Sequence, residues 1–166
     1  MFQTDLNFSL VEWVYDVWTI ILKIINMKYI FKCLYLKSDN HPDIWPSCMF
    51  VNEQNNTNDI PKIYEYLAIS IGSDIYLPHV IQQHFTIIEQ VENSPEQVLG
   101  GGGMQFSLDF HHDKVVFYHN EFDEEDGWPS LSCPLSTFKN ALIAWHAFLQ
   151  LPKSIYSQLE TVADME

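Results

Sequence analysis

Two neighbouring apolar segments constrain the fold of this chain more than any other feature. Apolar and polar side chains alternate along residues 104–110, and they alternate again along residues 115–119. A period of two residues is typical of a strand that buries one face. Because four polar residues, 111–114, join the segments, we predict an antiparallel hairpin. A lone hairpin is barely stable in water, so its apolar face must pack against other elements.

An amphipathic helix is predicted close behind the hairpin. Apolar residues recur at helical spacing, and the polar positions between them would form the opposite face. The members of this stripe are Leu135, Phe138, Leu142, Trp145 and Leu149. Ser132 or Ser136 would cap the start of the helix, and Pro152 would end it.

The first half of the chain supplies another strand and a second helix. Residues 29–36 are apolar on both faces, as in a central strand, and residues 48–51 could form a second short strand. The turn-forming residues of 37–46 and the asparagine-rich residues 52–59 predict exposed loops. Residues 78–91 carry an apolar stripe after Pro78, which predicts a helix that covers one face of the sheet.

Three further stretches are less regular. Residues 60–71 fit a helix opened by Asp59 with Pro61 in its first turn, although residues 67–71 also alternate like a strand, and we favour the helix. The four glycines of 100–103 open a strand in an acidic chain and lack the helix and lysine of a phosphate-binding loop, so they indicate a flexible connector or a close backbone approach. The tail, 153–166, would add a short helix or fray.

The N-terminus allows three interpretations. Residues 8–25 are strongly apolar, but Glu12, Asp16 and Lys23 fall on one helical face, which favours an amphipathic packed helix over a membrane span. Alternatively, residues 1–26 are a non-native upstream extension and Met27 is the true start, or residues 8–25 associate with a membrane. We therefore predict one α+β domain over 27–152, in which an antiparallel or mixed sheet is packed by two or three helices, followed by the tail.

The charge of the chain restricts its partners. It contains 22 acidic and 8 basic residues, a formal net charge of −14, and every base is lysine. Without arginine, the usual bidentate reader of phosphate and guanine, direct binding to nucleic acid is not expected. Such a charge would instead steer the protein towards basic partners, or simply keep it soluble. Three widely spaced cysteines with no C-x-x-C pair indicate reduced thiols in the cytoplasm.

The predicted binding site centres on the acidic segment that follows the hairpin. Five of the six residues 121–126 are acidic, and a tryptophan follows at position 128. The acids would steer a basic partner, and the aromatic side chains would supply the contacts that dominate binding energy. A merely solvated loop is the alternative. The predicted contact residues are Asp109, Asp113, Tyr118, Glu121, Phe122, Asp123, Glu124, Glu125, Asp126 and Trp128.

Catalytic and metal-binding patterns are missing from the sequence. His111 and His112 would point to opposite faces of a strand, and His111 and His119 at facing ends of the hairpin carry only a weak metal hypothesis. The acidic segment lacks the spacing of an EF-hand loop, and no G-x-S-x-G elbow occurs. We therefore predict no enzyme activity, no cofactor and no metal. The alternative from another class is a metal-dependent hydrolase that uses the histidines and acids.

The second half of the chain resembles a known class of protein. Residues 104–152, with the segments Met-Gln-Phe-Ser-Leu-Asp-Phe, Lys-Val-Val-Phe-Tyr-His and Leu-Ser-Cys-Pro-Leu, are similar to immunity proteins of bacterial polymorphic-toxin and contact-dependent growth-inhibition systems. The resemblance implies a cytosolic protein that binds the C-terminal domain of a cognate toxin, often a tRNA- or DNA-cleaving nuclease, and blocks its active site. It implies no shared catalytic residues and no membrane association, and it leaves the oligomeric state open.

Overall fold

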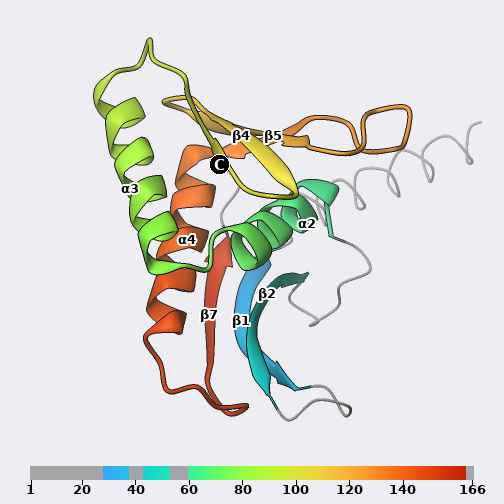
Figure 1. Ribbon diagram of the computed structural model, residues 1–166, viewed down its shortest axis with the longest axis vertical. Helices are drawn as coiled ribbons and strands as arrows, with labels where there is room; N and C mark the ends of the chain where they lie inside the picture. Colours follow the sequence, from blue (N-terminus) through green and yellow to red (C-terminus); the bar gives the residue numbers. More distant parts are fainter. Residues whose placement is uncertain (1–27, 38–42, 53–59, 164–166) are drawn as a thin grey trace, which may run out of the picture.

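The computed structural model describes residues 28–37, 43–52 and 60–163, and within them it shows an α+β fold. Two antiparallel sheets, one of three strands and one of four, pack around helices in a single compact unit (Figure 1). The predicted fold class is confirmed. The expected single sheet is in fact two, because strands from both ends of the chain build the smaller sheet.

The three-stranded sheet has the order β2-β1-β7. Its centre, β1 (Tyr29–Lys37), confirms the predicted strand. The strand β2 (Ile44–Asn52) is longer than expected. Residues 44–46, which were predicted to belong to an exposed loop, are already part of this strand. There Pro46 pairs with Tyr35, which is possible because β2 is an edge strand and a proline at an edge can turn its missing donor outwards.

The other edge of this sheet is β7 (Gln158–Ala163), which pairs with β1 from Tyr29↔Ala163 to Leu34↔Gln158. The helix or frayed end predicted for the tail is therefore wrong. The free edge of β1 offers the tail a row of backbone partners, and pairing satisfies the N–H and C=O groups of both strands.

The four-stranded sheet has the order β3-β4-β5-β6. The strands β4 (Phe106–Phe110) and β5 (Lys114–His119) form the predicted hairpin, although Met104 lies outside it and is exposed. The glycine run is itself the strand β3 (Leu99–Gly102), so it does not serve as a flexible connector. The strand β6 (Leu131–Pro134) was not expected from the sequence.

Three helices lie within the described residues. The helix favoured for 60–71 is confirmed as α2 (Lys62–Ile69), which continues into the π-helical turn η1 (Ser70–Asp74). The helix α3 (Pro78–Asn93) is also confirmed.

The last predicted helix is confirmed as α4 (Leu135–Leu149), but its start differs from the prediction. Pro134 occupies the N-cap position, and no side chain caps the helix. Ser132 lies in β6 and Ser136 within the helix, so neither predicted cap is correct. For α2, Pro61 is itself the N-cap residue, and Asp59 lies outside the described residues.

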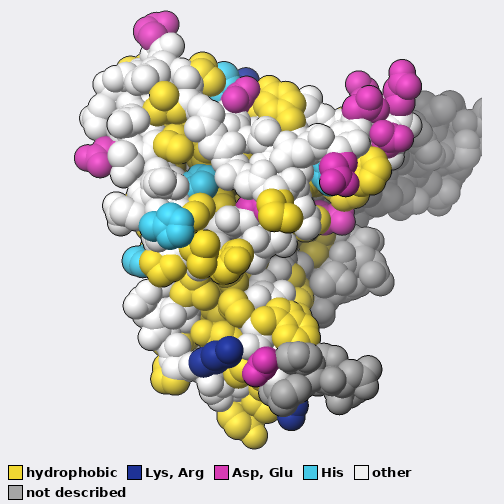
Figure 2. Space-filling view, in the orientation of Figure 1, with side chains coloured by type: hydrophobic (Ala, Val, Ile, Leu, Met, Phe, Trp, Pro, Cys, Tyr) yellow, Lys and Arg dark blue, Asp and Glu magenta, His cyan; other side chains and the backbone are white. Residues whose placement is uncertain are grey.

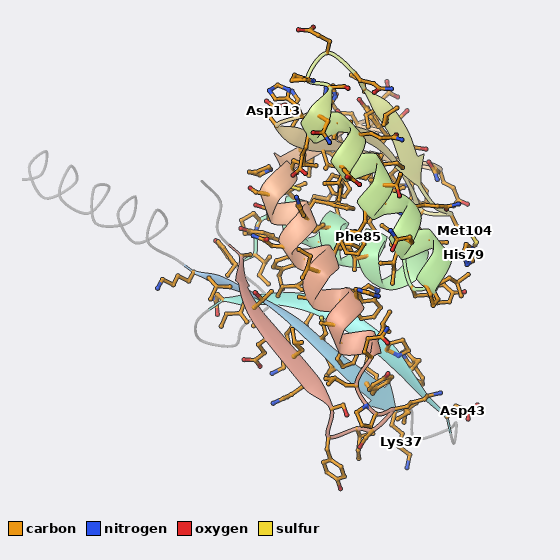
Figure 3. All side chains as sticks on the ribbon, turned by 90° about the vertical axis from the view of Figure 1, so that its left-hand side faces the viewer. Lys37, Asp43, His79, Phe85, Met104 and Asp113 are labelled. Atoms are coloured by element: carbon orange, nitrogen blue, oxygen red, sulfur yellow. The ribbon has the colours of Figure 1, made fainter. Side chains whose placement is uncertain are left out.

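The helix α4 connects the two sheets into one core. Near its start, Phe138 packs against Phe110 of the larger sheet, with ring centroids 5.2 Å apart. Near its end, Phe148 packs against Tyr35 of the smaller sheet at 4.8 Å. Figure 3 shows α4 crossing from one sheet to the other, with α3 on its outer side.

The predicted apolar segment 8–25 lies outside the described residues. Among the described helices, none has the length and hydropathy that a membrane span requires.

Candidate functional site

The acidic segment folds into a turn that its own backbone closes. We call residues 121–127 the acidic turn. The carbonyl of Asp123 accepts a hydrogen bond from the Trp128 N–H at 2.7 Å, and the carbonyl of Glu124 accepts one from the Gly127 N–H at 3.0 Å. Gly127 has φ of 82°. This pair of bonds around a left-handed glycine is the Schellman arrangement that ends helices, so the turn has a defined shape.

The acidic side chains of the turn have different roles. Asp123 Oδ1 accepts hydrogen bonds from the N–H groups of Glu125 at 2.8 Å and Asp126 at 3.4 Å, and thereby stabilises the turn. Glu124 and Glu125 are exposed, and their side chains have no hydrogen-bond partner in the described part of the chain. Their charges therefore remain available to another molecule.

Aromatic side chains support the turn from below. Trp128 is partly buried and stacks on Tyr66 of α2, with ring centroids 5.4 Å apart. Its ring also lies 4.6 Å from His119 and 6.3 Å from Phe122. We call these residues and Phe106, which touches three of them, the aromatic cluster. Phe122 is 45% exposed, so the cluster reaches the surface beside the acids.

His119 fixes the first residues of the turn. Its Nδ1 accepts hydrogen bonds from the N–H groups of Glu121 at 3.2 Å and Phe122 at 3.1 Å. A ring nitrogen that accepts carries a lone pair, so the proton of the neutral ring is on Nε2.

Two residues of α2 attach the turn to the rest of the fold. Lys62 Nζ donates to the Gly127 carbonyl and lies 4.7 Å from the centroid of the Trp128 ring, a cation–π contact. The Tyr66 hydroxyl donates to the Pro129 carbonyl at 3.1 Å. Burial and then the nearby charge of Glu65 raise the pKa of Tyr66, so its hydroxyl stays protonated and can donate.

Five of the acids gather at one place on the surface. In Figure 1 the acidic turn is the orange loop that extends from the larger sheet, and Figure 2 shows acidic side chains at its tip, next to hydrophobic ones. The neighbouring cation Lys62 is exposed and lies against the ring of Trp128. The turn therefore presents carboxylates and aromatic side chains next to each other, with one lysine at their border.

The structure brings together most of the predicted contact residues. Seven belong to the acidic turn or its aromatic support: Glu121, Phe122, Asp123, Glu124, Glu125, Asp126 and Trp128. Asp109 and Tyr118 lie on the outer face of the sheet, where Tyr118 hydrogen-bonds to Asp109. Partial burial, the Asp109 charge and this hydrogen bond raise the pKa of Tyr118.

Asp113 is not part of this group. It lies in the turn between β4 and β5, at the opposite end of the hairpin, because the register pairs Phe106 rather than Asp113 with His119. Its carbonyl accepts the Leu135 N–H at 2.9 Å. The structure therefore places Asp113 away from the acidic turn, and its predicted role in binding stays a prediction.

Sequence reasoning missed Lys62, Tyr66 and His119 as members of the site. Lys62 and Tyr66 are more than fifty positions before Trp128, and nothing in the local pattern of α2 signals a contact with it. His119 could have been found, because the alternation of β5 places it on the same face as Phe117 and Val115.

The metal hypothesis finds no support in the geometry. His111 lies beside Lys114 at one end of the hairpin and His119 at the other. Among the described residues, no three His, Cys, Asp or Glu side chains are grouped to hold a metal ion. Burial raises the pKa of Cys33 and Cys133 to about 12, so both are thiols at neutral pH and unsuited to nucleophilic attack.

Comparisons of the chain with protein-family models, with curated proteins and with solved structures found no match.

Proposed function

We propose that this protein is an acidic inhibitor of the immunity type, which binds the basic C-terminal domain of a cognate toxin and blocks its active site. The observation that carries the proposal is the acidic turn: exposed carboxylates on a backbone of defined shape, beside exposed and partly buried aromatic rings. A toxin that cleaves nucleic acid lines its active cleft with lysine and arginine, and this surface is complementary to such a cleft.

The defined shape of the turn favours binding. A loop that orders itself on contact loses conformational entropy, and this cost reduces its affinity. The acidic turn is already ordered by its Schellman bonds and by the contacts of Trp128 with Tyr66 and Lys62. The carboxylates of Glu124 and Glu125 can therefore meet a basic surface without that cost.

The composition of the chain supports the same reading. A net charge of −14 without arginine is unsuited to nucleic acid and suited to a basic protein that itself binds nucleic acid. A toxin that cleaves tRNA or DNA acts in the cytoplasm, and the inhibitor would act there too.

The proposal is tested with the C-terminal domain of a toxin encoded beside this chain. Association and dissociation rates are measured by surface plasmon resonance over a series of salt concentrations. Glu124→Gln/Glu125→Gln should slow association several-fold and flatten its salt dependence, with a smaller change in dissociation, because the pair steers the encounter. The substitution leaves Asp123 in place, so the turn keeps its shape.

The matched control is Glu89→Gln/Glu96→Gln, which removes the same charge from α3 and from the segment that follows it. Equal effects of the two double variants would show that only net charge matters and would reject the acidic turn as the docking surface. A neighbouring toxin domain that fails to bind the wild-type chain would reject the proposed function.

A further inference from the structure

A second surface lies along the glycine strand β3, at the open edge of the larger sheet. The strand order places β3 first, and within the described residues no strand pairs with its outer side. Residues 100–103 are all glycine, so this stretch carries no side chains of its own. An unpaired strand edge is a template for another strand.

The register shows which backbone groups point outwards. Gly103 N–H donates to the Phe106 carbonyl at 2.9 Å, so this pair is hydrogen-bonded. Because hydrogen-bonded and non-bonded pairs alternate in an antiparallel ladder, Gly101 bonds to β4, and Gly100 and Gly102 turn their N–H and C=O groups away from it. These outward groups are spaced two residues apart, as an incoming strand requires.

A groove runs beside these groups. It has a volume of about 780 Å³ and lies between the four glycines on one side and α3 on the other. The exposed polar residues of α3 that line it are His79, Gln82, Gln83 and Thr86. His79 lines one end of the groove, and in Figure 3 it lies near Met104 of the β3–β4 turn. A Cβ at Gly100 would meet nothing within 4 Å, so the outer face of the sheet is open above this residue.

The floor of the groove holds a hydrogen-bond acceptor without a partner. His84 is 3% exposed, and its Nδ1 donates to the Val80 carbonyl at 2.8 Å. The other ring nitrogen, Nε2, therefore carries a lone pair, and it has no partner among the described residues. It lies 3.4 Å from the position of a Cβ on Gly101, and so faces the glycine strand.

Charge indicates what the groove accepts. Residues 63–113, which include η1, α3, β3 and β4, contain no lysine or arginine and seven acids, of which Asp74 lines the groove and Glu92 is paired with Lys139 of α4. An occupant with basic side chains would thus meet no repulsion from these elements, whereas a second copy of this acidic chain would.

We propose that the edge of β3 binds an extended basic segment of another protein, which adds to the larger sheet as a further strand through the backbone of Gly100 and Gly102. Main-chain hydrogen bonds would supply affinity, and the lysine or arginine side chains of the segment would face the acidic surroundings. This surface is distinct from the acidic turn and does not depend on the proposed function.

The probe for this surface is an eight-residue peptide of alternating valine and lysine, titrated into the full-length protein and followed by NMR. Binding should shift the Gly100 and Gly102 amide signals and slow their exchange with solvent. A peptide with proline at alternate positions lacks the donors for a ladder and should not bind. A valine–glutamate peptide tests the charge and should bind at least tenfold more weakly.

Variants of Gly100 isolate the backbone contribution. Gly100→Pro removes the outward N–H without breaking a bond to β4, and should weaken binding of the valine–lysine peptide by about tenfold. Gly100→Ala keeps the N–H and should bind as the wild type does. If the proline variant fails to fold, the wild-type protein still tests the backbone contact, because exchange of its Gly100 amide with solvent should slow when the valine–lysine peptide binds.

Three results would overturn the proposal: no binding of the valine–lysine peptide at millimolar concentration, equal binding by the proline and alanine variants, or unchanged exchange at Gly100 when the peptide is bound. If Glu124→Gln/Glu125→Gln abolishes binding and Gly100→Pro does not, the peptide binds at the acidic turn; the β3 proposal then fails and the proposed function stands.

Discussion

The side chain of Asp74 occupies the space that any side chain at position 103 would need. A Cβ on Gly103 would lie 2.3 Å from the Asp74 Cβ, closer than real contacts allow. The Asp74 carboxylate uses this proximity to accept hydrogen bonds from the N–H groups of Met104 at 3.0 Å, Gln105 at 3.2 Å and Phe106 at 3.3 Å. The end of η1 is thereby attached to the β3–β4 turn, although about thirty residues separate them in sequence.

Gly103→Ala should therefore destabilise the protein. The added methyl group would push Asp74 away and lengthen its bonds to the turn, at a cost of about 1–3 kcal/mol in the free energy of unfolding. Urea denaturation followed by circular dichroism measures this cost. Gly100→Ala is the control, because open space surrounds that position, and it should change stability by less than about 0.5 kcal/mol. Equal midpoints for the two variants would contradict the packing described for Gly103.

Lys62→Gln should loosen the acidic turn without unfolding the protein. The substitution removes the hydrogen bond to the Gly127 carbonyl and the cation–π contact with Trp128, which together are worth about 1 kcal/mol at a partly exposed site. Hydrogen exchange should become several-fold faster at the Trp128 amide, whose bond to Asp123 closes the turn. Lys114→Gln, which neutralises an exposed lysine in β5, should leave this exchange rate unchanged. Unaltered exchange in the Lys62 variant would show that the turn is ordered without α2.

The sequence predicted the elements that have a strong period. The stripe from Leu135 to Leu149 and the alternation of residues 106–110 are long enough to identify α4 and β4, because burial of one face imposes the spacing. The strand β6 has four residues, too few for a period, and β7 is a half-exposed edge strand without a strong apolar face. Both were missed because long-range pairing, rather than local pattern, makes them strands.

The residues of the candidate site fall into the same two groups, those that a local pattern reveals and those that only the folded chain brings together. The acids and Trp128 were found because they are adjacent in the chain. The contact between Lys62 and Trp128 joins residues 66 positions apart, and only the packing of α2 against the larger sheet brings them together. Asp113 was grouped with the acids because it is near them in sequence, yet the hairpin register carries it to the other end of β5.

Trp145→Phe should be among the more destabilising single changes in α4. The Trp145 ring is fully buried, and its Nε1 donates to the Ile75 carbonyl at 2.8 Å. Phenylalanine would leave that buried carbonyl without its donor and leave a small cavity, which should cost about 2–4 kcal/mol. Thermal and urea unfolding give the value. Ile143→Val, at a 49% exposed position of the same helix, should cost less than about 0.5 kcal/mol, and a Trp145 variant as stable as this control would contradict the importance of the bond.

His84 should make the stability of the protein depend on pH. Its ring lies between Phe110 and Phe138, and burial lowers its pKa below the ordinary value of 6.5, although the Val80 carbonyl and the charge of Asp74 oppose this shift. The unfolded chain therefore binds a proton more readily than the folded one. Stability should be highest above pH 6.5 and should fall as the pH is lowered through 6.5 towards the depressed pKa of the folded state.

The free energy of unfolding, measured in urea at pH 7.5 and pH 5.5, should decrease more in the wild type than in His84→Gln, which has no charge to gain. His146→Gln is the matched control, since it removes an exposed histidine instead of a buried one. If His84→Gln loses as much stability as the wild type between these two pH values, groups other than His84 govern the response.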